Sequence, residues 1–294
     1  MVGESHGTFA PRAAVELVAI PAGQEADLRF FESDGRQLDG IPAFRRMADA
    51  NLTVWAAGNQ VFAMTKVIED FQALHPGLTV ALMTLPPGMI LKAIQARGWS
   101  LDDARLTLRP DVFATVSVTQ LRDTSEISNY IVYIHNALEL MVSKGNPRHV
   151  GDLHDLTRAD LRVMLPNPLT EGIMSFYAKP ILQRLGLWTA LSPGADCAGC
   201  ERAAHVHFTT VHHREIPAAI AGGAPVEGIP LPAGQNAADQ VEYVAGALRD
   251  SPHAAAAAVF IDFLGSQRGQ DIYTACGFLP AAKDERVPRP LPAN

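Results

Sequence analysis

The sequence has few cysteines, no long apolar run and no excess of basic residues. Three cysteines among 294 residues are too few for a disulfide scaffold. The longest all-apolar stretch, residues 254–260, is far shorter than the roughly 18 residues that a membrane-spanning helix needs. Lysine and arginine total 24 against 31 aspartates and glutamates, a formal net charge of −7. A membrane span and a nucleic-acid partner are therefore not expected.

Signatures of common enzyme classes are also missing. The sequence contains no G-x-S-x-G nucleophile elbow, no phosphate-binding P-loop, no H-E-x-x-H zinc motif and no G-x-G-x-x-G after a strand. These absences favour a binding protein over an enzyme. The first residues have neither a basic region nor an apolar segment, so this sequence shows no signal peptide.

The apolar content of 48% supports a sizeable core, and its pattern alternates between strands and helices. Residues 1–50 lack clear periodicity and are expected to form an N-terminal extension with one or two strands. Strands are expected at residues 52–55, 78–85, 111–114, 136–143 and 161–165. Helices are expected at residues 61–74, 89–97, 151–160, 173–185, 252–264 and 267–275. This order predicts an α/β protein with two similar lobes, each a mainly parallel sheet flanked by helices; a one-lobe dinucleotide-binding type of fold is the alternative.

Small residues recur between the expected strands and the helices that follow them. Gly58, Gly88 and Gly172 would let a ligand approach the backbone N–H groups at helix N-termini, where the helix dipole favours anions. Each of these segments could also be an ordinary turn between a strand and a helix. The ligand-site interpretation therefore depends on the set and not on any single member.

Several segments resemble the extracytoplasmic solute-binding proteins of ABC transporters, in particular the molybdate-binding type. They are residues 51–58 (Asn-Leu-Thr-Val-Trp-Ala-Ala-Gly), 110–115, 136–147, 168–172 and the ending Gly277-Phe278-Leu279-Pro280. The resemblance spans residues 51–282 and implies a type II periplasmic binding fold with a ligand cleft between two lobes. It also implies a monomer outside the cytoplasm that delivers a small anion to an ABC transporter permease and requires no cofactor.

The resemblance also implies lobe boundaries and binding residues. Lobe 1 would comprise residues 51–135 and 244–294, and lobe 2 residues 136–243. Contacts to the anion would come from Ala57, Gly58, Asn59, Pro87, Gly88, Thr115, Thr170, Glu171 and Gly172. Two features depart from the family. The first two loops lack the usual serine hydroxyls, and a strand's worth of sequence is missing after Gly223, through remodelling of the lobe or loss of a segment.

Two cysteines and four histidines crowd residues 197–213. Cys197, Cys200, His205 and His207 could hold zinc or copper, which predicts metal binding or delivery as the alternative function. A local disulfide between Cys197 and Cys200 with surface histidines explains the same residues, and a redox pair is a third interpretation. If residues 205–211 form a strand, His205 and His207 share its polar face.

His212, His213 and Arg214 stand at the expected end of that strand, just before a helix that runs through Ala221. This position predicts that they point toward the cleft and contact the ligand. The alternative is that Arg214 and Glu215 form an ion pair at the start of the helix. Catalysis through His212 and Glu215 is the weakest hypothesis, because the sequence offers no nucleophile or cofactor for it.

Overall fold

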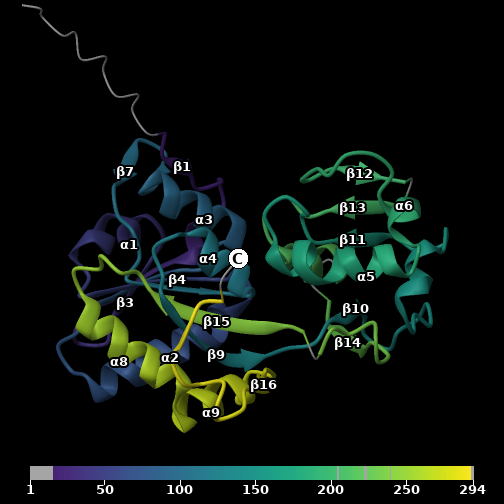
Figure 1. Ribbon diagram of the computed structural model, residues 1–294. Coiled ribbons are helices and arrows are strands. Elements are labelled where there is room, and N and C mark those ends of the chain that lie inside the picture. Colours follow the sequence, from purple (N-terminus) through teal and green to yellow (C-terminus); the bar gives the residue numbers. More distant parts are fainter. Residues whose placement is uncertain (1–15, 204, 222–223, 239, 293–294) are drawn as a thin grey trace, which may run out of the picture.

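The computed structural model describes residues 16–203, 205–221, 224–238 and 240–292, and these form two lobes joined by crossing segments (Figure 1). Residues 1–15 of the expected extension lie outside the described residues, as do Gly222 and Gly223 before the expected missing strand. No helix in the described ranges is long and apolar enough to span a membrane.

Lobe 1 is built on one large sheet, which counts nine strands among the described residues. Its order is β16-β9-β15-β8-β4-β5-β2-β3, with β17 also paired to β9. The strands are β2 (Leu28–Phe31), β3 (Gln37–Asp39), β4 (Leu52–Ala56), β5 (Val80–Met83), β8 (Val112–Thr115), β9 (Asn129–His135), β15 (Glu242–Ala247), β16 (Leu279–Pro280) and β17 (Arg289–Pro290). The central strands β5, β4 and β8 run parallel, as the sequence predicts.

Helices cover both faces of this sheet, so its central strands are buried on both sides. The helices are α1 (Gly40–Arg46), α2 (Val61–Leu74), α3 (Pro87–Ala96), α4 (Val118–Asp123), α8 (Ala254–Gly265) and α9 (Gln267–Ala275). Val54 of β4 packs in the core that includes α2, α8 and α9, whereas its neighbour Trp55 packs in the core that includes α1, α3 and α4. This alternation is the side-chain period of a strand.

The expectation that residues 1–50 form an extension is wrong for the described part. β2 pairs with β5 along its length, and Phe30 and Phe31 are buried on opposite faces of the large sheet. Val18 and Ala19 form β1, which pairs with β6 (Trp99–Leu101), and β6 pairs with β7 (Ala104–Leu106). These strands pair with partners far along the chain, and no local pattern in the sequence reports such pairing.

Lobe 2 contains two separate sheets among the described residues. β10 (Glu139–Ser143) pairs antiparallel with β14 (Val226–Pro230). β11 (Val163–Leu165), β13 (Val206–Phe208) and β12 (Glu201–Arg202) form the second sheet, in that order. The helices are α5 (Lys179–Arg184), α6 (Trp188–Leu191) and α7 (Ile216–Ala221).

The helix expected at residues 173–185 has an irregular first half. Its first six residues, Ile173–Ala178, form a π-helix that continues into α5. Pro180 has no backbone N–H and cannot donate to the carbonyl four residues earlier, which favours wider winding at this point. The helix expected at residues 151–160 is one short 3-10 helix, Leu153–Thr157, capped by Asp152.

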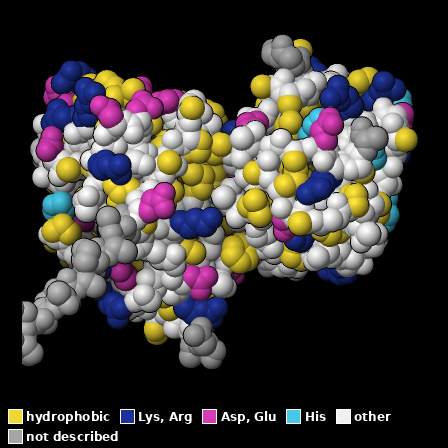
Figure 2. Space-filling view, turned by 90° about the horizontal axis from the view of Figure 1, so that it is seen from above, with side chains coloured by type: hydrophobic (Ala, Val, Ile, Leu, Met, Phe, Trp, Pro, Cys, Tyr) yellow, Lys and Arg dark blue, Asp and Glu magenta, His cyan; other side chains and the backbone are white. Residues whose placement is uncertain are grey.

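The chain crosses between the lobes after β9 and again before β15, and both crossings lie close together (Figure 1). The α/β architecture is therefore confirmed, while the residues chosen as lobe boundaries stay a prediction. Seen from above, hydrophobic side chains gather on the side of lobe 1 that faces lobe 2 (Figure 2).

Candidate functional site

Three glycines lie where the two lobes touch. The Gly88 N–H donates to the Thr170 carbonyl at 3.0 Å, and a Cβ on Gly88 would lie 2.9 Å from the same oxygen. A Cβ on Gly172 would lie 2.7 Å from Cγ2 of Val116, and one on Gly58 would lie 2.5 Å from Cε1 of His212. The structure thus brings the glycine loops of both lobes together, and the absence of side chains permits this approach.

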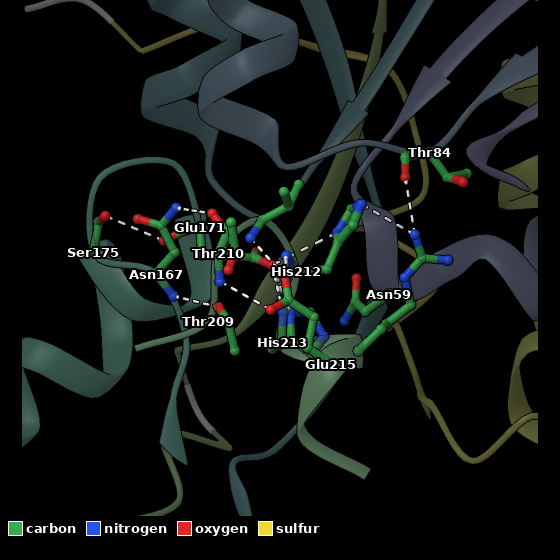
Figure 3. A network of polar contacts seen from close by, with 12 residues as sticks. Asn59, Thr84, Asn167, Glu171, Ser175, Thr209, Thr210, His212, His213 and Glu215 are labelled. Carbon is green, nitrogen blue, oxygen red and sulfur yellow. Dashed lines mark hydrogen bonds and ion pairs between the residues drawn. The ribbon is translucent and has the colours of Figure 1, made fainter. Parts of the chain in front are cut away.

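A buried carboxylate of lobe 1 meets a histidine and an arginine of lobe 2. Asp27 ends a 3-10 helix (Glu25–Asp27) and is 2% exposed. One of its oxygens lies 2.8 Å from Nε2 of His212, which is also buried, and the other accepts a hydrogen bond from Arg214. The Thr84 hydroxyl donates to Asp27 at 3.3 Å. These contacts link the two lobes by charge at their interface. Figure 3 shows His212, His213 and Glu215 of lobe 2 beside Thr84 of lobe 1.

Glu215 caps the segment that carries these donors. It is the last residue of a 3-10 helix (His213–Glu215), and its carboxylate accepts hydrogen bonds from the backbone N–H groups of Thr210, Val211 and His212 at 2.6–2.9 Å. The carboxylate beside Arg214 is therefore that of Asp27 and not that of Glu215. Arg214 therefore points toward lobe 1, as expected if it lines the cleft between the lobes.

Glu171 supports the second histidine of the pair. Its carboxylate lies 2.9 Å from Nδ1 of His213 and accepts the His213 backbone N–H at the same distance. Burial raises the pKa of the Glu171 carboxyl, but the charge and hydrogen bonds of His213 lower it, and the balance lies below its usual value. Glu171 is therefore held as an anion inside the protein. We call Asp27, Thr84, Glu171, His212, His213 and Arg214 the inter-lobe cluster.

The lowered pKa of Glu171 predicts acid sensitivity of the folded state. A depressed carboxyl pKa adds stability that is present above the unfolded value of about 4.5 and is lost as the pH falls through the folded value. We expect Glu171→Gln to flatten the pH dependence of the unfolding free energy below pH 4.5. Glu69→Gln, at an exposed position on α2, is the control. Chemical denaturation from pH 3 to 7 measures both; equal slopes would contradict the role of Glu171.

Three residues that the sequence offered as anion contacts use their polar groups within lobe 1. The Ala57 N–H donates to the Ala114 carbonyl at 2.9 Å, the Thr115 hydroxyl donates to Gln120, and the Asn59 amide donates to the Tyr243 hydroxyl. Ala57 and Thr115 are also buried. Pro87 is buried as the first residue of α3 and has no N–H to offer.

Other polar atoms at the lobe interface have no hydrogen-bond partner among the described residues. They are Oγ1 of Thr170, Nδ1 of His212 and Nε of Arg214, and all are buried. Nδ1 of His212 lies 3.8 Å from Glu171, which is too long for a hydrogen bond. Buried polar groups are rarely left unpaired in folded proteins, so such a set is a mark of a ligand site.

The cysteine and histidine cluster takes the form of the disulfide interpretation. Cys197 and Cys200 are joined by a disulfide bond. His205 contacts the Leu156 carbonyl at 3.2 Å, and His207 lies 3.1 Å from Glu201. Across the part of the chain that the structure describes, no group of three or more His, Cys, Asp and Glu side chains could hold a metal ion. Cysteines joined in a disulfide have no thiolate to offer a metal, so they do not fit the expected metal site.

The sequence did not predict the positions of Asp27, Thr84 and Val116 at the lobe interface. Asp27 stands in a stretch without periodicity, and its role depends on a contact with residues 185 and 187 positions later. No local pattern reports such a contact. The histidine and arginine side chains could be predicted because they lie directly between a strand and a helix.

Comparison with known proteins decides the family. Residues 52–279 match the bacterial extracellular solute-binding proteins. The chain belongs to this family. None of the curated proteins matches it.

Solved structures with the same fold include the periplasmic molybdate-binding protein of Azotobacter vinelandii, with 15% identity, a TM-score of 0.58, and coverage of 79% of this chain and 100% of that one. The sulfate-binding protein SubI of Mycobacterium tuberculosis matches with 16% identity, a TM-score of 0.56, and coverage of 80% and 88%. An ABC-transporter substrate-binding protein of Agrobacterium tumefaciens matches with 14% identity, a TM-score of 0.58, and coverage of 85% and 81%. The expected type II periplasmic binding fold is thereby confirmed.

Proposed function

We propose that this solute-binding protein captures a small oxyanion between its two lobes and delivers it, in the periplasm or an equivalent compartment, to an ABC transporter permease. One observation carries the proposal: His212 and Arg214 of lobe 2 converge on a single buried carboxylate, Asp27 of lobe 1. A carboxylate presents two oxygens in the way an oxyanion does. The donors that hold Asp27 are therefore suited to an anion that takes its place.

The unpartnered atoms support the same conclusion. Arg214 contacts Asp27 through one terminal nitrogen, and its Nε has no partner among the described residues. A guanidinium can bind an oxyanion through two parallel N–H groups. Oγ1 of Thr170 and Nδ1 of His212 are further free polar atoms at the interface. An anion seated here would satisfy groups that Asp27 leaves unpaired.

Charge requires that Asp27 and the anion exchange. Asp27 and Glu171 already place two buried carboxyl groups beside Arg214, His212 and His213. Adding a divalent oxyanion while Asp27 stays would bury like charges together, which is costly where the dielectric constant is low. In our proposal the lobes part, Asp27 releases Arg214, and the lobes close again on the anion.

Thermal unfolding with different solutes tests this function. A ligand that binds only the folded state stabilises it by RT ln(1 + [L]/Kd), or about 2.7 kcal/mol at a hundredfold excess over Kd. We expect one of molybdate, tungstate, sulfate and phosphate to raise the midpoint, whereas chloride at equal ionic strength leaves it unchanged. No shift with any of the four would contradict an oxyanion site.

The same assay distinguishes metal delivery, the alternative function. Zinc and copper are tested separately, with and without a chelator and with the disulfide of Cys197 and Cys200 reduced. A shift that appears only with metal and disappears on chelation would favour metal delivery over oxyanion capture. A shift that appears only with an oxyanion favours the inter-lobe cluster.

A further inference from the structure

We infer that lobe 2 carries a binding slot for one extended peptide strand, between β10 and β11. Among the described residues, β10 pairs only with β14 and β11 pairs only with β13, so each has one edge without a strand beside it. In the view of Figure 1, α5 overlaps the space between β11 and β10. Both strands line the same cavity and α7 contacts both of them, so their unpaired edges border one space. We call the space between them the strand slot.

The strand slot is part of a cavity of about 970 Å³ that is lined by residues of both strands and of α7. The same cavity extends to the lobe interface, where Phe62 and Phe278 of lobe 1 and His213 also line it. Its apolar lining includes Leu140, Val142, Val163, Leu165, Ile216 and Ile220. Exposed sheet edges beside apolar surface are where proteins bind an additional strand.

Backbone groups on both edges point into the slot. The Lys144 N–H donates to the Pro225 carbonyl at 3.2 Å, so by the alternation of an antiparallel pair the N–H and C=O of Met141 and Ser143 face away from β14. On β11, the Val163 N–H donates to His205 at 2.8 Å and the Leu165 carbonyl accepts from Thr209 at 2.9 Å. The N–H and C=O of Met164, between them, therefore face away from β13.

These backbone groups select a peptide over an apolar small molecule. A hydrocarbon would cover the N–H and C=O groups of Met141, Ser143 and Met164 without satisfying them, which is costly for buried polar groups. A peptide strand satisfies both edges and fills the apolar space with its side chains. It would join the two sheets of lobe 2 into one.

Strand direction and charge specify the peptide further. β10 leads away from the lobe crossing after β9, whereas β11 leads to the loop that contains Thr170 at the lobe interface. A strand parallel to β11 would thus be antiparallel to β10, with its N-terminal end beside Arg148 and Arg162, which line the cavity. Asp160 lines the same end and lies 4.0 Å from Arg148, whereas Arg162 has no carboxylate partner in the described ranges. The occupant is therefore an extended, mainly apolar segment with an acidic residue at its N-terminal end.

A pair of labelled peptides tests this inference with the intact protein. The probe is fluorescein-labelled Asp-Val-Thr-Val-Thr-Val-amide, and its control carries N-methyl groups on alternate amides, which removes hydrogen bonds along one edge. We expect saturable binding of the probe by fluorescence polarisation and at least tenfold weaker binding of the N-methylated peptide. Three results would overturn the inference. They are no binding of the probe, equal binding of the two peptides, and displacement of both peptides by laurate to the same extent.

A variant on β11 gives an independent test. Met164→Pro removes the N–H that faces the slot, while Val163 and Leu165 keep the hydrogen bonds to the β13 side. We expect at least tenfold weaker probe binding than in Met164→Ala, which keeps the N–H. Far-UV circular dichroism and thermal unfolding show whether Met164→Pro folds; if it does not, the N-methylated peptide on the unmodified chain decides. Neither test requires the inter-lobe cluster to bind an anion.

Discussion

Asp27→Asn is expected to bind the oxyanion at least tenfold more tightly than the unmodified chain. Asp27 competes with the anion for His212 and Arg214. The asparagine keeps the shape but loses the charge, so it binds Arg214 less strongly and does not repel the incoming anion. A tenfold change corresponds to about 1.4 kcal/mol, which is modest against the several kcal/mol of like-charge repulsion at about 4 Å. Equilibrium dialysis against the anion that gives the largest thermal shift measures the effect.

Two observations complete this experiment. Without ligand, Asp27→Asn should unfold at a lower temperature, because Arg214 then lacks its buried carboxylate partner. Asp39→Asn removes a carboxylate that is 59% exposed in the same lobe and should change neither property. Equal or weaker anion binding by Asp27→Asn would mean that Asp27 is not a competitor, and the exchange of Asp27 for the anion would be wrong.

Gly88→Ala is expected to hold the lobes apart. The added Cβ would lie 2.9 Å from the Thr170 carbonyl oxygen, closer than carbon and oxygen atoms normally approach. The obstacle is backbone, which cannot rotate away as a side chain can, so relief requires the lobes to separate. We expect a larger radius of gyration by small-angle X-ray scattering and at least tenfold weaker anion binding, a loss of about 1.4 kcal/mol.

Gly151→Ala is the matched control for this substitution. The nearest atom to a Cβ at Gly151 is 3.8 Å away, an ordinary contact, and Gly151 belongs to lobe 2 away from the interface. It should leave both the radius of gyration and the anion affinity unchanged. If Gly88→Ala behaves like Gly151→Ala, contact between the lobes at Thr170 is not needed for binding.

The parts of the fold that could be predicted are those with a local signal. α2 and α9 begin and end at the expected residues, because an apolar face repeats over 14 and 9 residues respectively. β2 and β3 could not be placed in the large sheet, since β3 joins it only through β2, and the pairing of β2 with β5 joins residues about 50 positions apart. The irregular first half of the helix after Gly172 precedes Pro180, which cannot donate a backbone hydrogen bond to the preceding turn.

In the inter-lobe cluster, too, only the residues with a local sequence signal could be predicted. The sequence predicted a strand before His212 and a helix after Arg214. Residues at such a junction were expected to point toward the other lobe. Their partner Asp27 carries no such signal, because it comes from a segment far away in the sequence. For Thr115, the sequence predicted the end of the strand correctly but not the direction of the side chain. The Thr115 hydroxyl donates to Gln120, which lies in the next helix.

The cysteine and histidine cluster was ambiguous for a chemical reason. The same pair of cysteines can bind a metal as thiolates or form a disulfide, and spacing alone does not separate the two states. The structure pairs Cys197 with Cys200 and disperses His205 and His207 to other partners. The strand expected over residues 205–211 is shorter, Val206–Phe208, so His205 lies outside it and the two histidines do not share a strand face. Within β13, Val206 and Phe208 are buried and His207 between them is partly exposed.

Titration calorimetry of the unmodified chain and of Arg214→Ala tests the central claim most directly. We predict that one of molybdate, tungstate, sulfate and phosphate binds the unmodified chain with one anion per chain. The same anion should bind Arg214→Ala at least tenfold more weakly, whereas Arg36→Ala, which removes a guanidinium that is 64% exposed, should bind it normally. Equal affinity of the Arg214→Ala variant, or no heat of binding with any of the four anions, would contradict an oxyanion site between the lobes.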